Sequence, residues 1–131
     1  MSQDNFSLPT IIRRFVAALN SFDEAALLAT LADDAFINDA QREFWGKPAI
    51  AAFMRKELIG PKVTMAVTDF RGHHELLAVD AWIDGEFDKA GLPHPLILTF
   101  YFTIEAGLIS TLFIMRNRPA SETLIRPQSA A

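Results

Sequence analysis

The sequence has 131 residues, of which 50% are hydrophobic and 21% charged, a profile typical of one compact domain. It contains no cysteine, which excludes disulfides, thiol nucleophiles and cysteine metal sites. The net charge of −4 and the lack of a basic run argue against nucleic-acid binding. The sequence shows no signal peptide and no apolar run of about 18 residues, the length that spans a bilayer. We therefore expect a soluble cytoplasmic protein that does not bind membranes.

Three helices are predicted in the N-terminal half. Apolar residues recur at three- and four-residue spacings over residues 8–19, which is typical of a helix with one buried face. Ser21 and Glu24 have the spacing of a capping box and predict a second, short helix. A short strand is expected at residues 35–38. Pro48 then opens a third helix, which Gly60 ends.

After Gly60 the hydrophobic period changes to two, which predicts four strands at residues 62–71, 75–87, 94–104 and 108–117. Short turns between them favour antiparallel pairing. The strand at 94–104 carries apolar side chains on both faces, so we expect its outer face to pack against a second subunit in a homodimer. The elements together predict an α+β fold, with three N-terminal helices packed on a curved antiparallel sheet around a small apolar pocket.

The order of elements predicts one domain over residues 1–118 and a flexible C-terminal tail over residues 119–131, which is rich in Pro, Ser and Ala. Adjacent His73 and His74 are expected in a solvated turn, since no acidic residue accompanies them at metal-ligand spacing. No metal site and no organic cofactor is predicted.

Five stretches of the chain carry a family resemblance. They are Ile11-Ile12-Arg13-Arg14-Phe15-Val16-Ala17-Ala18-Leu19-Asn20, Leu31-Ala32-Asp33-Asp34-Ala35, Asn38-Asp39, Gly46-Lys47-Pro48-Ala49-Ile50 and Glu105-Ala106-Gly107-Leu108-Ile109. With them the chain resembles the SnoaL-like branch of the NTF2-like superfamily, and especially bacterial ketosteroid isomerase. The resemblance implies a cone-shaped fold. It implies less about function, because the superfamily includes cyclases, isomerases, hydrolases and proteins without activity.

The resemblance places Asp39 where ketosteroid isomerase has its catalytic base. A carboxylate in the wall of an apolar pocket suits proton transfer, although a turn cap is an equally open interpretation of Asp39. That isomerase uses a tyrosine and a protonated aspartate as its oxyanion hole. Here Phe15 takes the tyrosine position, and Leu98 or its neighbour Thr99 takes the aspartate position. Neither Phe nor Leu donates a hydrogen bond, so steroid isomerase activity is not expected.

The resemblance also implies which strand faces point into the cone. It places Asp80, Trp82 and Asp84 inside from one strand and Arg116 inside from the last. Asp80 then needs a partner, either Arg116 or a histidine, in a structural ion pair or a catalytic couple. The expected pocket lining comprises Phe15, Phe36, Phe53, Met54, Trp82, Asp84, Leu98, Phe100, Leu112 and Ile114.

Two classes of function remain open. The first is a SnoaL-like enzyme, an isomerase, cyclase or hydrolase in which Asp39 is the acid or base for a small apolar or ketone-like ligand. The second is a non-catalytic module that binds an apolar ligand or a partner chain in the same cone. A third interpretation follows the limonene-epoxide hydrolases, with Asp80, Arg116 and either Asp39 or Asp84 imitating their Asp-Arg-Asp arrangement.

Overall fold

The structure is a computed structural model that describes residues 7–73 and 75–116. The predicted tail at residues 119–131 lies outside the described residues. The helices are α1 (Thr10–Asn20), α2 (Glu24–Ala29) and α3 (Gly46–Met54), and the π-helical turn η2 (Arg55–Ile59) continues α3. The strands are β1 (Leu31–Asp39), β2 (Arg42–Trp45), β3 (Thr64–His73), β4 (Leu76–Asp84), β5 (Leu96–Glu105) and β6 (Leu108–Arg116). In the part of the chain described, no helix is long and apolar enough to cross a membrane.

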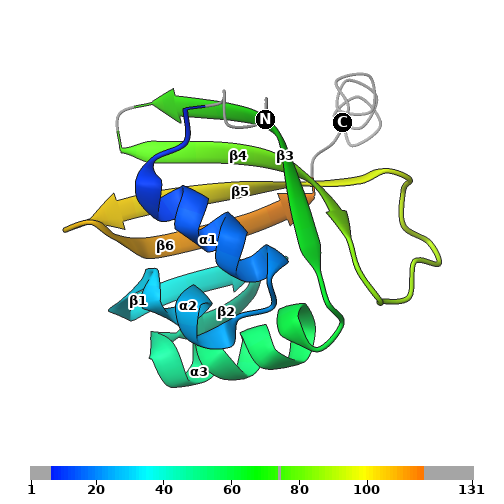
Figure 1. The fold of residues 1–131 in the computed structure, drawn as a ribbon, viewed down its shortest axis with the longest axis horizontal. Coiled ribbons are helices and arrows are strands. Elements are labelled where there is room, and N and C mark those ends of the chain that lie inside the picture. The colour runs from blue at the N-terminus through cyan, green and yellow to red at the C-terminus, as the bar shows by residue number, and fades with distance from the viewer. Residues whose placement is uncertain (1–6, 74, 117–131) are drawn as a thin grey trace, which may run out of the picture.

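The six strands form one curved sheet in the order β2-β1-β6-β5-β4-β3, so the α+β prediction is confirmed (Figure 1). The prediction of a purely antiparallel sheet is wrong, because β1 and β6 are paired in parallel. The two strands lie far apart in the sequence, and their connection contains α3 and the β3–β5 meander. The register shifts between Val67 and Asp69 and between Thr103 and Ile104. Irregularities of this kind bend a sheet locally.

The helices lie on one face of the sheet, which we call the inner face (Figure 1). Helix α1 buries Ile12 and Phe15 there, and the Phe15 ring meets Phe102 of β5 edge-on at 5.3 Å between centroids. The predicted apolar stripe of this helix is therefore the stripe that is buried. Burying a large aromatic side chain of this kind contributes several kcal/mol, on the order of the 3–5 lost when Phe is cut to Ala.

Helix α2 begins two residues later than the capping-box pattern predicts. Its N-cap is Asp23, whose carboxylate accepts a hydrogen bond from the Ala26 N–H at 3.1 Å. The Ser21 hydroxyl instead donates to the carbonyl of Ala17 in the last turn of α1. Serine makes such backward bonds readily, so the spacing to Glu24 was misleading.

One side chain joins α1 to the edge strand β3. The Asn20 amide donates from Nδ2 to the Met65 carbonyl at 3.0 Å and accepts the Met65 N–H on Oδ1 at 2.8 Å. It thus satisfies the backbone of β3 on the side away from β4, where the sheet ends.

We predict that Asn20→Ala lowers the free energy of unfolding by about 1–3 kcal/mol, because it leaves a part-buried backbone donor and acceptor without their partner. Chemical denaturation measures the loss. The exposed neighbour substitution Ser21→Ala should change stability by less than about 0.5 kcal/mol. Equal effects of the two substitutions would contradict a specific role for the Asn20 clamp.

Candidate functional site

The hairpin between β1 and β2 was not predicted, and it positions Asp39. Its two-residue turn, Ala40-Gln41, has positive φ at both residues, 54° and 72°, without a glycine. The turn is held by the Asn38 side chain, which accepts the Gln41 N–H at 2.9 Å, and by the Ala40 N–H, which donates to the Ile114 carbonyl at 3.3 Å. Backbone conformations that disfavour L side chains are found often at functional sites. Here the turn sets Asp39 directly opposite Arg42 in the register.

Arg42 joins two carboxylates at one place. Its Nη2 donates to Asp39 Oδ2 at 2.7 Å, and its two terminal nitrogens bind the two oxygens of Glu57 at 2.8 Å each. Glu57 comes from η2, more than a dozen residues further along the chain. Single π-helical turns often occur at functional sites. We call these three residues the carboxylate–arginine cluster.

The hydrogen bonds of the cluster stabilise the charged forms of Glu57 and Arg42. The bidentate hydrogen bonds from Arg42 hold the pKa of Glu57 below its ordinary value of 4.5, and burial opposes this only in part. The hydrogen bonds that Arg42 donates, first to Glu57 and then to Asp39, raise the pKa of Arg42. Arginine is in any case always protonated in proteins. Two carboxylates and one guanidinium leave a net charge of −1.

The cluster lies at the rim of an apolar cavity, the inner pocket, of about 400 Å³. Among the described residues that line it, Asp39 and Glu57 are the only charged ones, and their side chains keep 23% and 32% exposure. The other lining residues are all apolar: Leu19, Phe53, Leu58, Val63, Ile83, Phe87, Leu92, Leu96, Leu98, Phe100 and Ile114. The pocket thus combines an apolar interior with a negatively charged rim, a common form for a small-molecule site.

Apart from Trp82 and Asp84 of β4, the residues expected in the pocket fall into three groups. Asp39 and four apolar residues do line it: Phe53, Leu98, Phe100 and Ile114. Three others are fully buried in the core and do not line it: Phe15, Met54 and Leu112. Phe36 lies on the opposite, outer face, where its ring packs against Trp45 at 4.1 Å and Phe113 at 5.6 Å.

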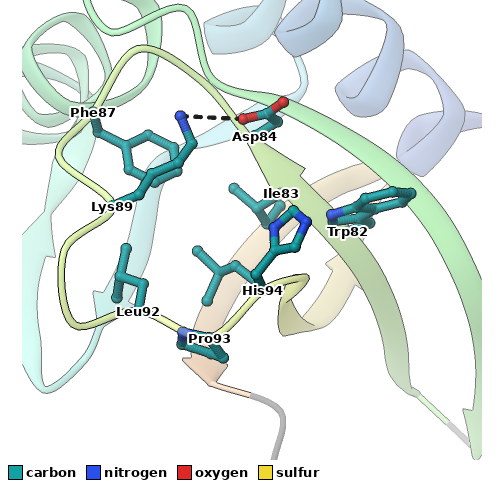
Figure 2. Close-up of a pocket in the computed structure, with 9 residues that line it drawn as sticks. Trp82, Ile83, Asp84, Phe87, Lys89, Leu92, Pro93 and His94 are labelled. Carbon is teal, nitrogen blue, oxygen red and sulfur yellow. Dashed lines mark ion pairs between the residues drawn. The ribbon is translucent and has the colours of Figure 1, made fainter.

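The expected orientation of β4 is wrong. Val79, Ala81 and Ile83 of this strand belong to the hydrophobic core, so the alternate residues point to the outer face, where Ala78 is also buried. Trp82 is 49% exposed, and Asp84 lies beside it on the outer side (Figure 2). The physical reason is the cost of burying two carboxylates, one on each side of Trp82, without a cation between them.

Asp80 does not pair with Arg116. Its carboxylate binds Arg71 at 2.8 and 3.2 Å and accepts the Thr99 hydroxyl at 2.7 Å, all on the outer face. Arg116 is exposed at the end of β6, opposite Leu98, and lines a different hollow with Asn38. Asp80, Arg116 and Asp39 therefore form no Asp-Arg-Asp arrangement.

Sequence reasoning missed Arg42 and Glu57. Arg42 could have been found from a two-residue turn directly after Asp39. In a hairpin the two residues that flank such a turn lie opposite each other, which here are Asp39 and Arg42. Glu57 had no local signal, because only the packing of α3 and η2 brings it to the hairpin.

The positions that correspond to the oxyanion hole of ketosteroid isomerase do not bring a hydrogen-bond donor into the inner pocket. Phe15 packs in the core, Leu98 lines the inner pocket, and Thr99 faces outward to Asp80. No side chain that lines the inner pocket within residues 7–73 and 75–116 carries a neutral hydrogen-bond donor. Within residues 7–73 and 75–116, no three His, Asp or Glu side chains are grouped to hold a metal ion.

Several solved structures share this architecture. A protein from Sinorhizobium meliloti, provisionally assigned as a polyketide cyclase, is 27% identical with a TM-score of 0.75, over 83% of this chain and 96% of its own. A SnoaL-like protein of unknown function from Burkholderia thailandensis is 14% identical with a TM-score of 0.67, over 82% and 92%. A protein of ketosteroid isomerase-like fold from Catenulispora acidiphila, in complex with trimethylamine, is 16% identical with a TM-score of 0.70, over 89% and 91%.

No protein-family model matches the sequence, and no curated protein matches it. The chain has the NTF2-like fold of the polyketide cyclase, ketosteroid isomerase-like and SnoaL-like proteins, and the resemblance predicted from its residues is confirmed.

We predict that acid weakens the carboxylate–arginine cluster. The folded-state pKa of Glu57 is lowered, so its contribution to stability is present above its ordinary pKa and is lost as the pH falls through the folded value. When the pH is lowered from 7 to 3, the free energy of unfolding should therefore fall more for the wild type than for Glu57→Gln. The variant has no carboxylate at position 57 that could take up a proton. Urea denaturation at the two pH values measures the difference.

The control is Glu105→Gln, at the exposed end of β5. It should follow the wild type in the same titration. If Glu57→Gln follows the wild type as well, the cluster does not stabilise the fold through Glu57.

Proposed function

We propose that the protein is a small-molecule enzyme that moves a proton between carbon atoms of a substrate, with Asp39 as the base. The observation that carries the proposal is the position of Asp39 at the rim of the inner pocket. Its Oδ2 is held by Arg42, whereas Oδ1 accepts no hydrogen bond from residues 7–73 and 75–116. A carboxylate that is oriented at one oxygen and unoccupied at the other suits general base catalysis.

Arg42 and Glu57 act as positioning residues in this proposal. Glu57 binds both terminal nitrogens of Arg42, which fixes the plane of the guanidinium. Arg42 in turn orients the Asp39 carboxylate through its contact at 2.7 Å. Because Glu57 and Asp39 already occupy these nitrogens, Arg42 has little capacity left to bind an oxyanion of the substrate.

The apolar lining supports a particular class of carbon acid. Removing one oxyanion donor typically costs about 2.7–4 kcal/mol of transition-state stabilisation, and the lining offers none. A simple ketone is therefore a poor substrate. A carbon acid flanked by two carbonyl groups delocalises its own negative charge, so it needs less help from the protein. We infer that the substrate is an apolar 1,3-dicarbonyl compound, which agrees with the similarity to a provisionally assigned polyketide cyclase.

We predict that the protein accelerates deuterium exchange at the central carbon of 1-phenyl-1,3-butanedione in heavy water, followed by proton NMR. Asp39→Asn should reduce the enzymatic rate at least about 100-fold, because general base catalysis contributes roughly 10²–10⁴-fold. Its melting temperature should change little, since an exposed ion pair contributes about 0–1 kcal/mol.

The matched control is Asp34→Asn, an exposed aspartate on the same strand, β1. It should retain the wild-type rate. A wild type that gives only the uncatalysed rate, or an Asp39→Asn variant as fast as the wild type, would contradict the proposed reaction.

A non-catalytic binding module is the second candidate. It is favoured by the lining itself: of the 13 described lining residues, 11 are apolar and none carries a neutral side-chain donor. In that case the diketone binds without exchange, Asp39→Asn keeps the wild-type affinity, and Phe100→Ala weakens it. Calorimetry together with the exchange assay separates the two candidates.

We also propose that the protein forms a homodimer through an outer patch made of Phe36, Trp45, Phe113 and Met115. These side chains lie on neighbouring strands β2, β1 and β6, and their rings are in contact. Trp45 is 65% exposed and Met115 55%. Contiguous apolar patches are unusual on monomers and are buried by a second copy in a twofold dimer.

We predict that Phe113→Glu converts the dimer to a monomer in sedimentation velocity, because the interface would bury two unpaired carboxylates. Circular dichroism verifies that the variant is folded. Ala29→Glu, an exposed position on α2, should remain dimeric. A monomeric wild type at micromolar concentration would exclude this interface.

A further inference from the structure

A second hollow, the outer cavity, lies where the C-terminal end of β4 meets the 85–95 connection to β5 (Figure 2). Its volume is about 310 Å³. The lining residues are Trp82, Ile83, Asp84, Phe87, Lys89, Leu92, Pro93, His94 and Leu96. Asp39 is not among them, so the outer cavity takes no part in the reaction proposed above.

Two flat rings line one side of this cavity. Trp82 remains 49% exposed although its strand neighbours Ala81 and Ile83 are buried. Figure 2 shows the His94 imidazole close to the indole, with Phe87 and Leu92 on the opposite side. A tryptophan that faces a hollow gains burial and stacking when an aromatic ring enters it. The imidazole adds one hydrogen-bond donor or acceptor at the edge of such a ring.

Lys89 and Asp84, which carry opposite charges, form an ion pair at the rim of the outer cavity. Lys89 lies 3.4 Å from Asp84 and also donates to the Gly85 carbonyl at 2.6 Å. The Gly85 N–H and Lys89 together hold the pKa of Asp84 below its ordinary value, so the carboxylate stays ionised at neutral pH. A charged ligand would have to compete with this pair, whereas a neutral ligand leaves it intact.

We propose that the outer cavity is a binding site for an uncharged, planar aromatic ring that carries a hydroxyl group. The ring stacks on Trp82, and its hydroxyl forms a hydrogen bond with His94. Trp82 is not part of the outer patch, and its strand β4 is separated from β6 by β5. The site is therefore distinct from the proposed dimer interface.

The outer cavity and the inner pocket share a wall. Ile83, Phe87, Leu92 and Leu96 line both, so the two spaces lie next to each other. The Phe87 ring packs closely against the backbone at Gly85, where an added Cβ would lie 3.0 Å from the ring and 3.1 Å from Val63 Cα.

The test is a titration with 2-naphthol, a planar neutral hydroxyarene, followed by the amide NMR shifts of the protein. The wild type should show saturable shifts at residues that line the outer cavity. Trp82→Ala should weaken binding at least about tenfold, the equivalent of 1.4 kcal/mol of lost stacking and burial. His94→Ala, a change at an exposed loop position, should weaken it about fivefold through the lost hydrogen bond.

The matched control is Leu76→Ala. Leu76 lies on the same strand and the same outer face as Trp82 and is equally exposed, at 47%, but does not line the cavity. It should bind 2-naphthol within about twofold of the wild type. The proposal is overturned if Trp82→Ala and His94→Ala bind like the wild type, or if only Phe100→Ala, in the inner pocket, weakens binding. The result does not depend on the proposed reaction, because no proton transfer from carbon is measured.

Discussion

One face of a six-stranded sheet has to be covered by apolar side chains, and three short helices cover only part of it. Where α1 and α3 pack, Phe15, Phe102 and Met54 are completely buried. The same face continues through Leu98, Phe100 and Ile114, which border a cavity that Leu19 of α1 and Phe53 of α3 line from the helix side. The inner pocket is thus the part of the core that the helices and the sheet leave unfilled. Its apolar character follows from its continuity with the packed region.

The charged side chains of Asp39 and Glu57 lie at the rim of this pocket. Two carboxylates so close together would repel each other, and Arg42 compensates that repulsion by binding both. The arrangement needs a hairpin turn with positive φ, the π-helical turn η2, and the packing that brings them together. Three separate elements therefore converge on Asp39, and this convergence distinguishes it from the exposed carboxylates Asp33 and Asp34 of the same strand.

The orientation of β4 shows how a family resemblance and a residue pattern can disagree. The resemblance placed Asp80, Trp82 and Asp84 inside the cone. The alternation of residues along the strand instead puts the two aspartates on one face and Val79, Ala81 and Ile83 on the other, which favours burial of the second face. The structure follows the alternation. Burial of charge costs more than exposure of one tryptophan, so the polar residues decided which face is buried. Trp82 is then available on the outer side, next to His94.

By itself the sequence determined the three helices, the four long strands, the apolar inner residues of β5 and the position of Asp39 beside a turn. These follow from local periodicity and turn residues, which act over a few neighbouring positions. Only the tertiary structure decided the parallel pairing of β1 with β6, the partners of Asp80 and Asp39, and the wall between the two cavities. Those features join residues that are distant in the chain, such as Arg42 and Glu57, and no local pattern encodes contacts that depend on how whole elements pack together.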